Sequence, residues 1–367
     1  MTVIDCDSHV MEPADLWLRY LEPKYRDRAI RIEEDDGVEK LIIGEKVVLE
    51  RVLAGLGGAH IDRVKLFTGG LKYADGCPPA SYEPHARAKL LDEWGVDLGV
   101  LFPTIGILPF PTEDVELANA YCRAYNSWQA DFFRAIPDRV VPIAAVNWFD
   151  VDEAAKELDR CLELGFRGLF VPPETVGDKR PGDAHFDPIW ARLQDAGMPG
   201  CLHVIVRFEG AAVPFSAWHG AGPVFGFGLG ATGQLIPAMA SLVLDLVFER
   251  FPKLKVVSVE AGCGYAAYLM DRLDEKHHFF KAMVPIKRKP SEYIRRNCYF
   301  VAEPEERSIG AMLRLVGEDN ILWGSDYPHV DSRLDAADLI RESVAGLDAG
   351  ETRRVLGENA VRLFGLA

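Results

Sequence analysis

Short apolar segments rich in β-branched residues alternate along the chain with longer segments of helical periodicity. The short segments predict strands, because they have the length and composition of buried β structure. There are eight of them, at residues 3–7, 98–103, 140–146, 168–171, 200–205, 255–259, 298–302 and 320–324. Strands that alternate with helices are typical of a parallel sheet built from βα units.

The intervening segments predict helices, and the clearest spans residues 115–135. Its apolar side chains recur at steps of four, four, three and four residues, so they share one face, which we interpret as core packing. They are Leu117, Tyr121, Tyr125, Trp128 and Phe132. Further helices are predicted over 153–164, 188–196, 235–250, 266–282, 305–316, 334–345 and 351–364. Eight strands followed by helices favour a (β/α)8 TIM barrel over an open doubly wound sheet, with residues 1–367 as one domain.

About ninety residues separate the first two predicted strands, where a short loop would suffice. Residues 28–50 alternate in polarity and have turn candidates at Asp36-Gly37 and at 43–45, which predicts a small antiparallel meander. The Gly-rich stretch that follows, 52–80, is predicted to be irregular. We expect this β-rich insertion, about residues 20–85, to form either a lid over the C-terminal face of the barrel or a dimer contact, and both remain open.

The charge balance narrows the classes of partner. The chain has 41 basic and 56 acidic residues and a net charge of −15. This excess argues against nucleic acid and anionic membranes, which both require a basic face. A small anionic ligand remains compatible, because a few local cations or a metal ion can hold it.

Cysteine usage and the N-terminal residues predict a cytoplasmic protein. The seven cysteines are scattered and form no CxxC pair, which indicates buried free thiols in a reducing compartment. Acidic residues stand where a signal peptide would need basic and then apolar ones, and no apolar run reaches the roughly 20 residues of a membrane span.

Three chemically active side chains stand at alternate positions where the first strand ends. Asp5, Asp7 and His9 lie in the segment IDCDSHVMEP, before Pro13 breaks the chain. Alternation places them on one face of a strand. In a barrel that face can point inward near the C-terminal rim, where catalytic groups of this fold lie. An Asp/His turn can also be a simple helix cap, so this segment alone is weak support for a metal site.

Two further predicted strands also end in side chains that can bind a metal ion. His203 interrupts the apolar fifth strand, and Asp326 follows the eighth, with His329 three residues later. Each alone has an ordinary structural explanation, a core histidine or a helix cap. Together with Asp7 and His9 they stand at the carboxyl ends of strands one, five and eight and can converge. Two imidazoles and two carboxylates predict a divalent metal site, with Zn²⁺ favoured and Mn²⁺ or Fe²⁺ acceptable.

These motifs resemble the amidohydrolase superfamily of metal-dependent barrels. Within it the chain is similar to the amidohydrolase-related branch that includes aminocarboxymuconate-semialdehyde decarboxylase and the resorcylate-type decarboxylases. The resemblance covers essentially the whole length. Its segments are DCDSHVMEP, DEWGVDLGVLFPT, IPDRVVPIAAV, HFDPIWARLQDAGMPGCLH, ILWGSDYPH and LGENAVRLFGL.

The resemblance implies roles for individual residues. Asp7-x-His9 stands where the family has His-x-His or Glu-x-His, and His203 matches the metal histidine of strand five. Asp326 matches the aspartate that contacts the metal and moves protons. The sixth strand departs from the family, since many members have a histidine followed by glycine where this chain has Glu260. That departure puts direct transfer of either family mechanism in doubt.

Other candidates for proton transfer or substrate binding follow from position alone. Glu260 can serve as an acid/base group if burial raises its pKa, or can pair with a cation or support His203. His329 is placed beside Asp326 on the rim, and His219, His277 and His278 are weaker alternatives that we interpret as structural or exposed. Arg207, just beyond the fifth strand, can bind a substrate carboxylate or can simply be solvated. The Gly-rich loop 220–233 lacks the preceding strand of a dinucleotide site.

Two enzymatic functions share this predicted site. The first is non-oxidative decarboxylation of a small aromatic or unsaturated acid with Asp326 as acid/base. The second is hydrolysis of a small amide, ester or lactone. The carboxylate-x-His motif and the family branch favour decarboxylation. A catalytically inactive binding module is a third hypothesis, disfavoured because all four candidate ligands are present. A homodimer or higher homo-oligomer is expected from the family.

Overall fold

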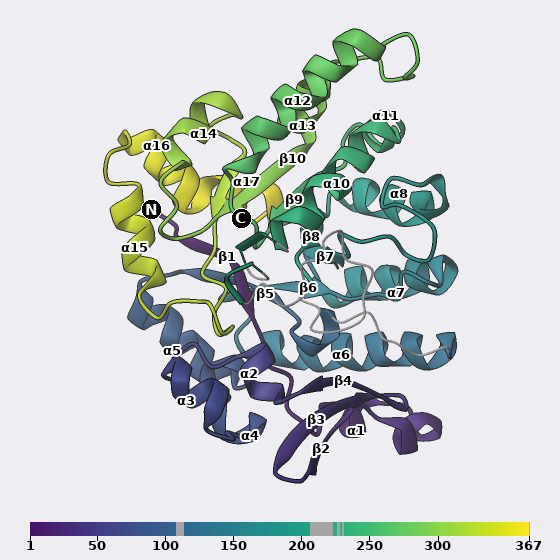
Figure 1. Cartoon of the computed structure of the whole chain (residues 1–367), viewed down its shortest axis with the longest axis vertical. Coiled ribbons are helices and arrows are strands. Elements are labelled where there is room, and N and C mark those ends of the chain that lie inside the picture. The colour runs from purple at the N-terminus through teal and green to yellow at the C-terminus, as the bar shows by residue number, and fades with distance from the viewer. Residues whose placement is uncertain (108–113, 206–222, 226–227, 230, 367) are drawn as a thin grey trace.

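Eight parallel strands in a computed structural model form a barrel surrounded by helices (Figure 1). The structure describes residues 1–107, 114–205, 223–225, 228–229 and 231–366. Each of the eight predicted segments contains one strand, and neighbours in the sheet follow chain order. The strands are β1 (Ile4–His9), β5 (Leu98–Phe102), β6 (Val140–Ala144), β7 (Gly168–Val171), β8 (Gly200–His203), β9 (Val256–Val259), β10 (Cys298–Ala302) and β11 (Ile321–Trp323). The (β/α)8 fold is therefore confirmed.

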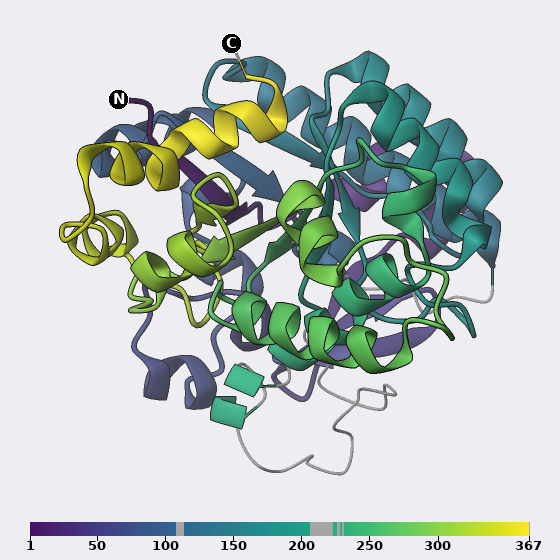
Figure 2. The ribbon, with the colours of Figure 1, turned by 90° about the horizontal axis from the view of Figure 1, so that it is seen from above.

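Side chains alternate along each strand between two apolar cores, one inside the barrel and one between the barrel and the helices. In β7 the side chain of Phe170 joins the cluster inside the barrel, whereas its neighbours Leu169 and Val171 join the cluster between barrel and helices. Both faces of the strands are thus buried, which explains why the segments are apolar throughout. The helical shell is seen around the strands in Figure 2.

The predicted helices are present, but one of them is divided into two. α6 (Val115–Ala135) has the predicted bounds, and Asp114 accepts a hydrogen bond from the Leu117 backbone at its first turn. The helix predicted over 235–250 is two helices, because Leu246 adopts a left-handed φ of 69° between them. The other helices of the shell are α5 (Pro84–Trp94), α7 (Val151–Leu164), α8 (Asp187–Ala196), α10 (Ala231–Leu244), α11 (Val247–Arg250), α12 (Tyr265–Phe280), α13 (Pro290–Asn297), α14 (Ile309–Leu315), α15 (Ala336–Ser343), α16 (Ala349–Arg353) and α17 (Asn359–Phe364).

The insertion after β1 contains the predicted meander. It consists of β2 (Arg31–Asp35), β3 (Val38–Ile43) and β4 (Lys46–Glu50), with Asp36 and Gly37 at positive φ in the first turn. The stretch predicted to be irregular instead forms short helices, which are separated by glycines that hide their periodicity. They are α2 (Val52–Leu56), α3 (Arg63–Thr68) and α4 (Tyr73–Gly76), and α1 (Leu16–Tyr20) precedes the meander.

The insertion and α1, which precedes it, pack against α6 and touch the end of the barrel. The rings of Trp17 and Tyr121 meet edge to face at 5.9 Å. The Ala59 backbone donates to the carbonyl of Pro328, and Arg63 donates to the carbonyl of Ser332, both in the loop after β11. A lid or dimer role for this insertion stays a prediction. Within the described residues, no helix is both long and apolar enough to cross a bilayer.

The barrel closes between β1 and β11 through side-chain as well as backbone hydrogen bonds. Ser325 donates its backbone N–H and its hydroxyl to the Asp5 carboxylate at 2.9 and 2.6 Å, and Asp326 N–H donates to the carbonyl of Asp7 at 2.7 Å. Gly324 is required here, because a Cβ atom would lie 2.3 Å from that of Asp7. Burial raises the pKa of Asp5 to about 7, although the bonds from Ser325 oppose the shift.

We expect Ser325→Ala to lower the free energy of unfolding by about 2–3 kcal/mol, since it leaves a buried Asp5 oxygen without its donor. Urea denaturation of protein kept in chelator measures the change without a contribution from bound metal. Thr68→Ala is the control, because the exposed Thr68 hydroxyl donates to the Val64 carbonyl of its own helix, and its effect should stay within about 0.5 kcal/mol. Equal effects of the two substitutions would contradict a special role for the closure.

Candidate metal centre

Four buried side chains from β1, β8 and the segment after β11 converge at the C-terminal end of the barrel. Asp7, His9, His203 and Asp326 are each at most 4% exposed. His9 Nε2 lies 3.3 Å from Asp7 Oδ1 and 3.3 Å from Asp326 Oδ1. His203 Nε2 lies 3.1 Å from His9 Nε2 and 3.4 Å from Asp7 Oδ1. The structure therefore brings together the four residues that the sequence nominated.

Hydrogen bonds at the far side of each imidazole assign its tautomer. His9 Nδ1 donates to the carbonyl of Pro103 and His203 Nδ1 to that of Val204, both at 2.8 Å. A neutral imidazole that donates from Nδ1 has a lone pair on Nε2. Burial lowers the pKa of His9, which favours this neutral form. The two Nε2 lone pairs consequently face each other.

Each carboxylate adds an acceptor 3.3 Å from His9 Nε2. Asp7 Oδ1 and Asp326 Oδ1 are buried and accept no hydrogen bond. Acceptor atoms at these separations in a low-dielectric interior repel one another unless a positive charge lies among them. Two nitrogen and two oxygen ligands with carbonyls fixing both imidazoles are a suitable donor set for a divalent metal ion. The residues present thus fit a metal, and Asp7, His9 and His203 could each supply one ligand atom.

His329 lies over this centre at its solvent side. Its ring stacks on that of His9 with centroids 3.8 Å apart. His329 Nδ1 lies 2.8 Å from Asp326 Oδ1, and its Nε2 is hydrogen-bonded to the hydroxyl of Thr104 at 3.0 Å. Burial and the neighbouring histidines lower the pKa of His329, so the ring is neutral at pH 7. His329 therefore lies directly against the Asp326 carboxylate.

Glu12 is a residue of the site that the sequence reasoning missed. Its fully buried carboxylate accepts backbone hydrogen bonds from Thr104, Ile105 and Gly106 at 2.9–3.1 Å. These bonds hold the loop after β5, and with it the Thr104 hydroxyl that contacts His329. The only signal in the sequence is the place of Glu12 within DCDSHVMEP, three residues after His9.

Additional carboxyl groups, Glu260 and Glu303, lie near Asp326. Glu260 follows β9 with φ at 60°, and its Oε2 lies 3.5 Å from His203 Nδ1. Burial raises the pKa of Glu260, and nearby Asp331 and Asp7 raise it further. Burial, with Asp7, also raises the pKa of Glu303 to about 8. Glu303 directly follows the seventh strand, a position that could have identified it in the sequence. Carboxylic acids kept neutral in this way can donate protons at pH 7.

The remaining predicted residues fall into two sets, those outside the described residues and those in α12. Arg207 and His219 lie outside the described residues, as does most of the loop 220–233. His277 and His278 are in the last turn of α12 and belong to none of the groups of metal-ligating side chains found in the described parts of the chain.

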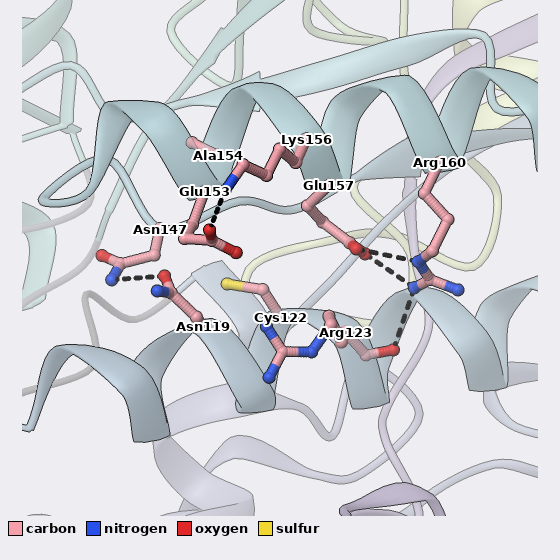
Figure 3. A pocket seen from close by; sticks show the side chains of 9 residues that line it. All are labelled: Asn119, Cys122, Arg123, Asn147, Glu153, Ala154, Lys156, Glu157 and Arg160. Carbon is pink, nitrogen blue, oxygen red and sulfur yellow. Dashed lines mark hydrogen bonds and ion pairs between the residues drawn. The ribbon is translucent and has the colours of Figure 1, made fainter.

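A separate pocket of about 190 Å³ lies between α6 and α7 (Figure 3). Its cations are already neutralised, since Arg160 pairs with Glu157, Lys156 with Glu153 and Arg123 with Glu22. It contains none of the predicted site residues, so we assign it no catalytic role.

Comparison with known proteins identifies the family and the fold. The sequence profile of the family described as Amidohydrolase matches residues 4–366. Gamma-resorcylate decarboxylase from Polaromonas sp. is 28% identical over 298 residues, which are 76% of this chain and 86% of that protein. The crystal structure of an amidohydrolase from Mycobacterium avium subsp. paratuberculosis is 27% identical with a TM-score of 0.83, covering 100% of this chain and 98% of the other.

A second solved structure shares the fold at lower identity. It is a dihydroxybenzoic acid decarboxylase from Polaromonas sp. with bound manganese and the inhibitor 2-nitroresorcinol. It is 20% identical with a TM-score of 0.68, and the match covers 100% of this chain and 97% of that one.

We expect His203→Ala to weaken metal binding at least about 100-fold, because it removes one of two nitrogen ligands. Competition with a chelator of known affinity, followed by elemental analysis of the protein fraction, measures the change. The matched control is His185→Ala, which removes an exposed imidazole. Unchanged metal affinity of His203→Ala, in a variant with native circular dichroism, would remove His203 from the metal site.

Proposed function

The chain belongs to the amidohydrolase family, and from this premise we propose that it is a metal-dependent decarboxylase of a small aromatic or unsaturated carboxylic acid. One observation carries the proposal: in the interior, His9 Nε2 lies 3.1–3.3 Å from acceptor atoms of His203, Asp7 and Asp326. Such a set is stabilised by a cation, and the neighbouring carboxyl groups can supply the proton that replaces CO2.

Asp7, His9, His203 and Asp326 would hold the metal. A divalent ion bound there supplies Lewis acidity toward a substrate oxygen. The mixed nitrogen and oxygen set favours Zn²⁺, and Mn²⁺ or Fe²⁺ are compatible with it. The manganese bound in the Polaromonas dihydroxybenzoic acid decarboxylase makes Mn²⁺ the first alternative to test.

Asp326 is the proposed proton donor to carbon. Burial and the negative charges of neighbouring carboxyl groups, with Glu260 first among them, raise its pKa well above the ordinary value. A protonated carboxyl can deliver its proton to the ring or alkene carbon as the bond from that carbon to the substrate carboxylate breaks and CO2 leaves. His329 orients this carboxyl through its 2.8 Å contact. Glu260 is proposed as a second acid/base group in place of the family's histidine, at 3.5 Å from His203.

The substrate is proposed to be a small anion held in a dry, partly aromatic site. The rings of Phe102 and Phe170 lie 4.8 and 6.2 Å from that of His203. Arg207 remains the predicted partner of a second substrate carboxylate or phenolate. The seven free, buried cysteines support the prediction of a reducing compartment such as the cytoplasm.

A substrate screen separates decarboxylation from hydrolysis. Protein reconstituted with Zn²⁺ or with Mn²⁺ is incubated with hydroxybenzoates, unsaturated semialdehyde acids, lactones and amides, and both CO2 and carboxylate release are followed. We expect CO2 release from an acid of the first two classes. Carboxylate release from a lactone or amide without CO2 would instead establish the hydrolase.

We expect Asp326→Asn to fold normally and to lower the turnover number by at least about 1,000-fold at saturating metal, because the amide cannot donate the proton. Turnover is measured on the substrate found in the screen. Asp335→Asn is the control, since that carboxylate is exposed and pairs with Arg333 on the surface. Turnover within about tenfold of the wild-type value would exclude Asp326 from the proton transfer.

A further inference from the structure

A single peptide group connects His203 to α10. His203 Nδ1 donates to the carbonyl of Val204 at 2.8 Å, and that carbonyl shares a planar trans peptide with the N–H of Ile205. The N–H and C=O of such a peptide point in opposite directions, so the Ile205 N–H points away from the imidazole. It donates to Oε1 of Gln234 at 3.3 Å. Gln234 Nε2 in turn donates to the Ile205 carbonyl at 2.9 Å, which gives this side-chain amide a partner for each of its polar atoms.

His9 has the same arrangement around a different peptide group. His9 Nδ1 donates to the carbonyl of Pro103 at 2.8 Å, and this carbonyl shares a peptide with the N–H of Thr104. The Thr104 N–H donates to Oε1 of Glu12 at 3.1 Å. A side-chain oxygen, a peptide group and an imidazole therefore follow one another in both cases. We call the two series of hydrogen bonds the Gln234 relay and the Glu12 relay.

The groups of both relays are buried. Gln234 is 4% exposed, Thr104 is 3% exposed, and Glu12 and both histidines are completely buried. A buried peptide N–H needs an acceptor, so Gln234 and Glu12 fix the orientation of the peptide that each of them contacts. Hydrogen bonds in series also polarise one another in a low-dielectric interior. The oxygen that accepts from each N–H thus strengthens the carbonyl of the same peptide as an acceptor for the imidazole.

The relays favour one of two proton positions on each imidazole. His9 Nε2 and His203 Nε2 lie 3.1 Å apart, which is hydrogen-bond distance. If the proton of either ring moved from Nδ1 to Nε2, that ring would donate to the other, and its own Nε2 lone pair would be lost. Metal binding would then require that this hydrogen bond be broken. Holding both protons at Nδ1 keeps two nitrogen lone pairs available for a metal ion.

We propose that Gln234 and Glu12 are positioning residues, each of which acts through one peptide group to hold a metal-binding histidine in its Nδ1–H tautomer. The effect of Glu12 extends beyond the Thr104 hydroxyl, because the Thr104 N–H belongs to the relay of His9. The proposal rests on the metal centre of the proposed function. It describes the metal-free protein, however, so its test requires neither substrate nor turnover.

Nitrogen NMR of the histidine rings in metal-free, full-length protein tests the proposal, because protonated and unprotonated ring nitrogens have different chemical shifts. The signals are assigned with His9→Ala and His203→Ala. In the wild type we expect the Nδ1–H tautomer at both positions. Gln234→Met removes the acceptor of one relay with little change in size and should bring His203 into exchange between tautomers, while His9 is unchanged. Glu12→Met should have the reciprocal effect, and Gln234→Met decides alone if that variant does not fold.

Metal affinity, measured by competition with a chelator, is the second readout. We expect Gln234→Met to weaken metal binding about tenfold or more, the usual effect of removing a group that supports a ligand. The matched control is Gln129→Met. Gln129 of α6 is also completely buried and donates to a strand carbonyl, that of Leu101, but it contacts neither relay peptide. Its substitution should leave metal affinity within about threefold of the wild-type value.

Gln234→Glu separates the relay from the other hydrogen bond of this side chain. A carboxylate keeps the acceptor for the Ile205 N–H and loses only the donor to the Ile205 carbonyl, so His203 should retain its Nδ1–H tautomer. An unchanged His203 tautomer or an unchanged metal affinity in Gln234→Met would overturn the proposal. An equal loss of affinity in Gln129→Met, or a Gln234→Glu variant that behaves like Gln234→Met, would overturn it too. If the protein proves to be a hydrolase or shows no turnover, the metal-free spectra still decide the proposal.

Discussion

The hydrogen bonds between Ser325 and Asp5 hold together the two ends of the barrel, and the candidate metal centre depends on them. Its ligands come from both sides of this closure: Asp7 and His9 belong to the first strand, and Asp326 follows the last. The closure brings a carboxylate and an imidazole of one strand against a carboxylate of the other. The resulting repulsion between buried acceptors is tolerated because a cation can occupy the point where they meet.

Neighbouring residues that are not candidate ligands hold the backbone of the metal centre in place. Arg87 of α5 is fully buried and donates to the backbone carbonyls of His9 and Ala80, and burial lowers its pKa to about 10. Glu12 fixes the loop that carries Thr104, and Thr104 contacts His329. α5, the helix that follows the insertion, therefore contributes to the centre through Arg87. Residues that never touch a substrate determine the positions of those proposed to do so.

The sequence was sufficient to predict the barrel, because each strand is buried on both sides and each helix has a regular apolar face. It was also sufficient to nominate Asp7, His9, His203 and Asp326, since strand ends of a barrel share one rim. It could not reveal Glu12 or Arg87, whose roles consist of hydrogen bonds to backbone groups distant in sequence. Nor could it reveal the break at Leu246, a left-handed residue without a glycine to mark it. The ligand roles themselves remain predictions, whereas the proximity of the four residues is observed.

Elemental analysis of protein purified without chelators and then reconstituted tests the central claim most directly. The account predicts about one equivalent of a divalent metal per chain, bound by the four converging side chains. Less than about a tenth of an equivalent, even after exposure to Zn²⁺ and Mn²⁺, would contradict it and would favour a barrel that has lost metal-dependent catalysis.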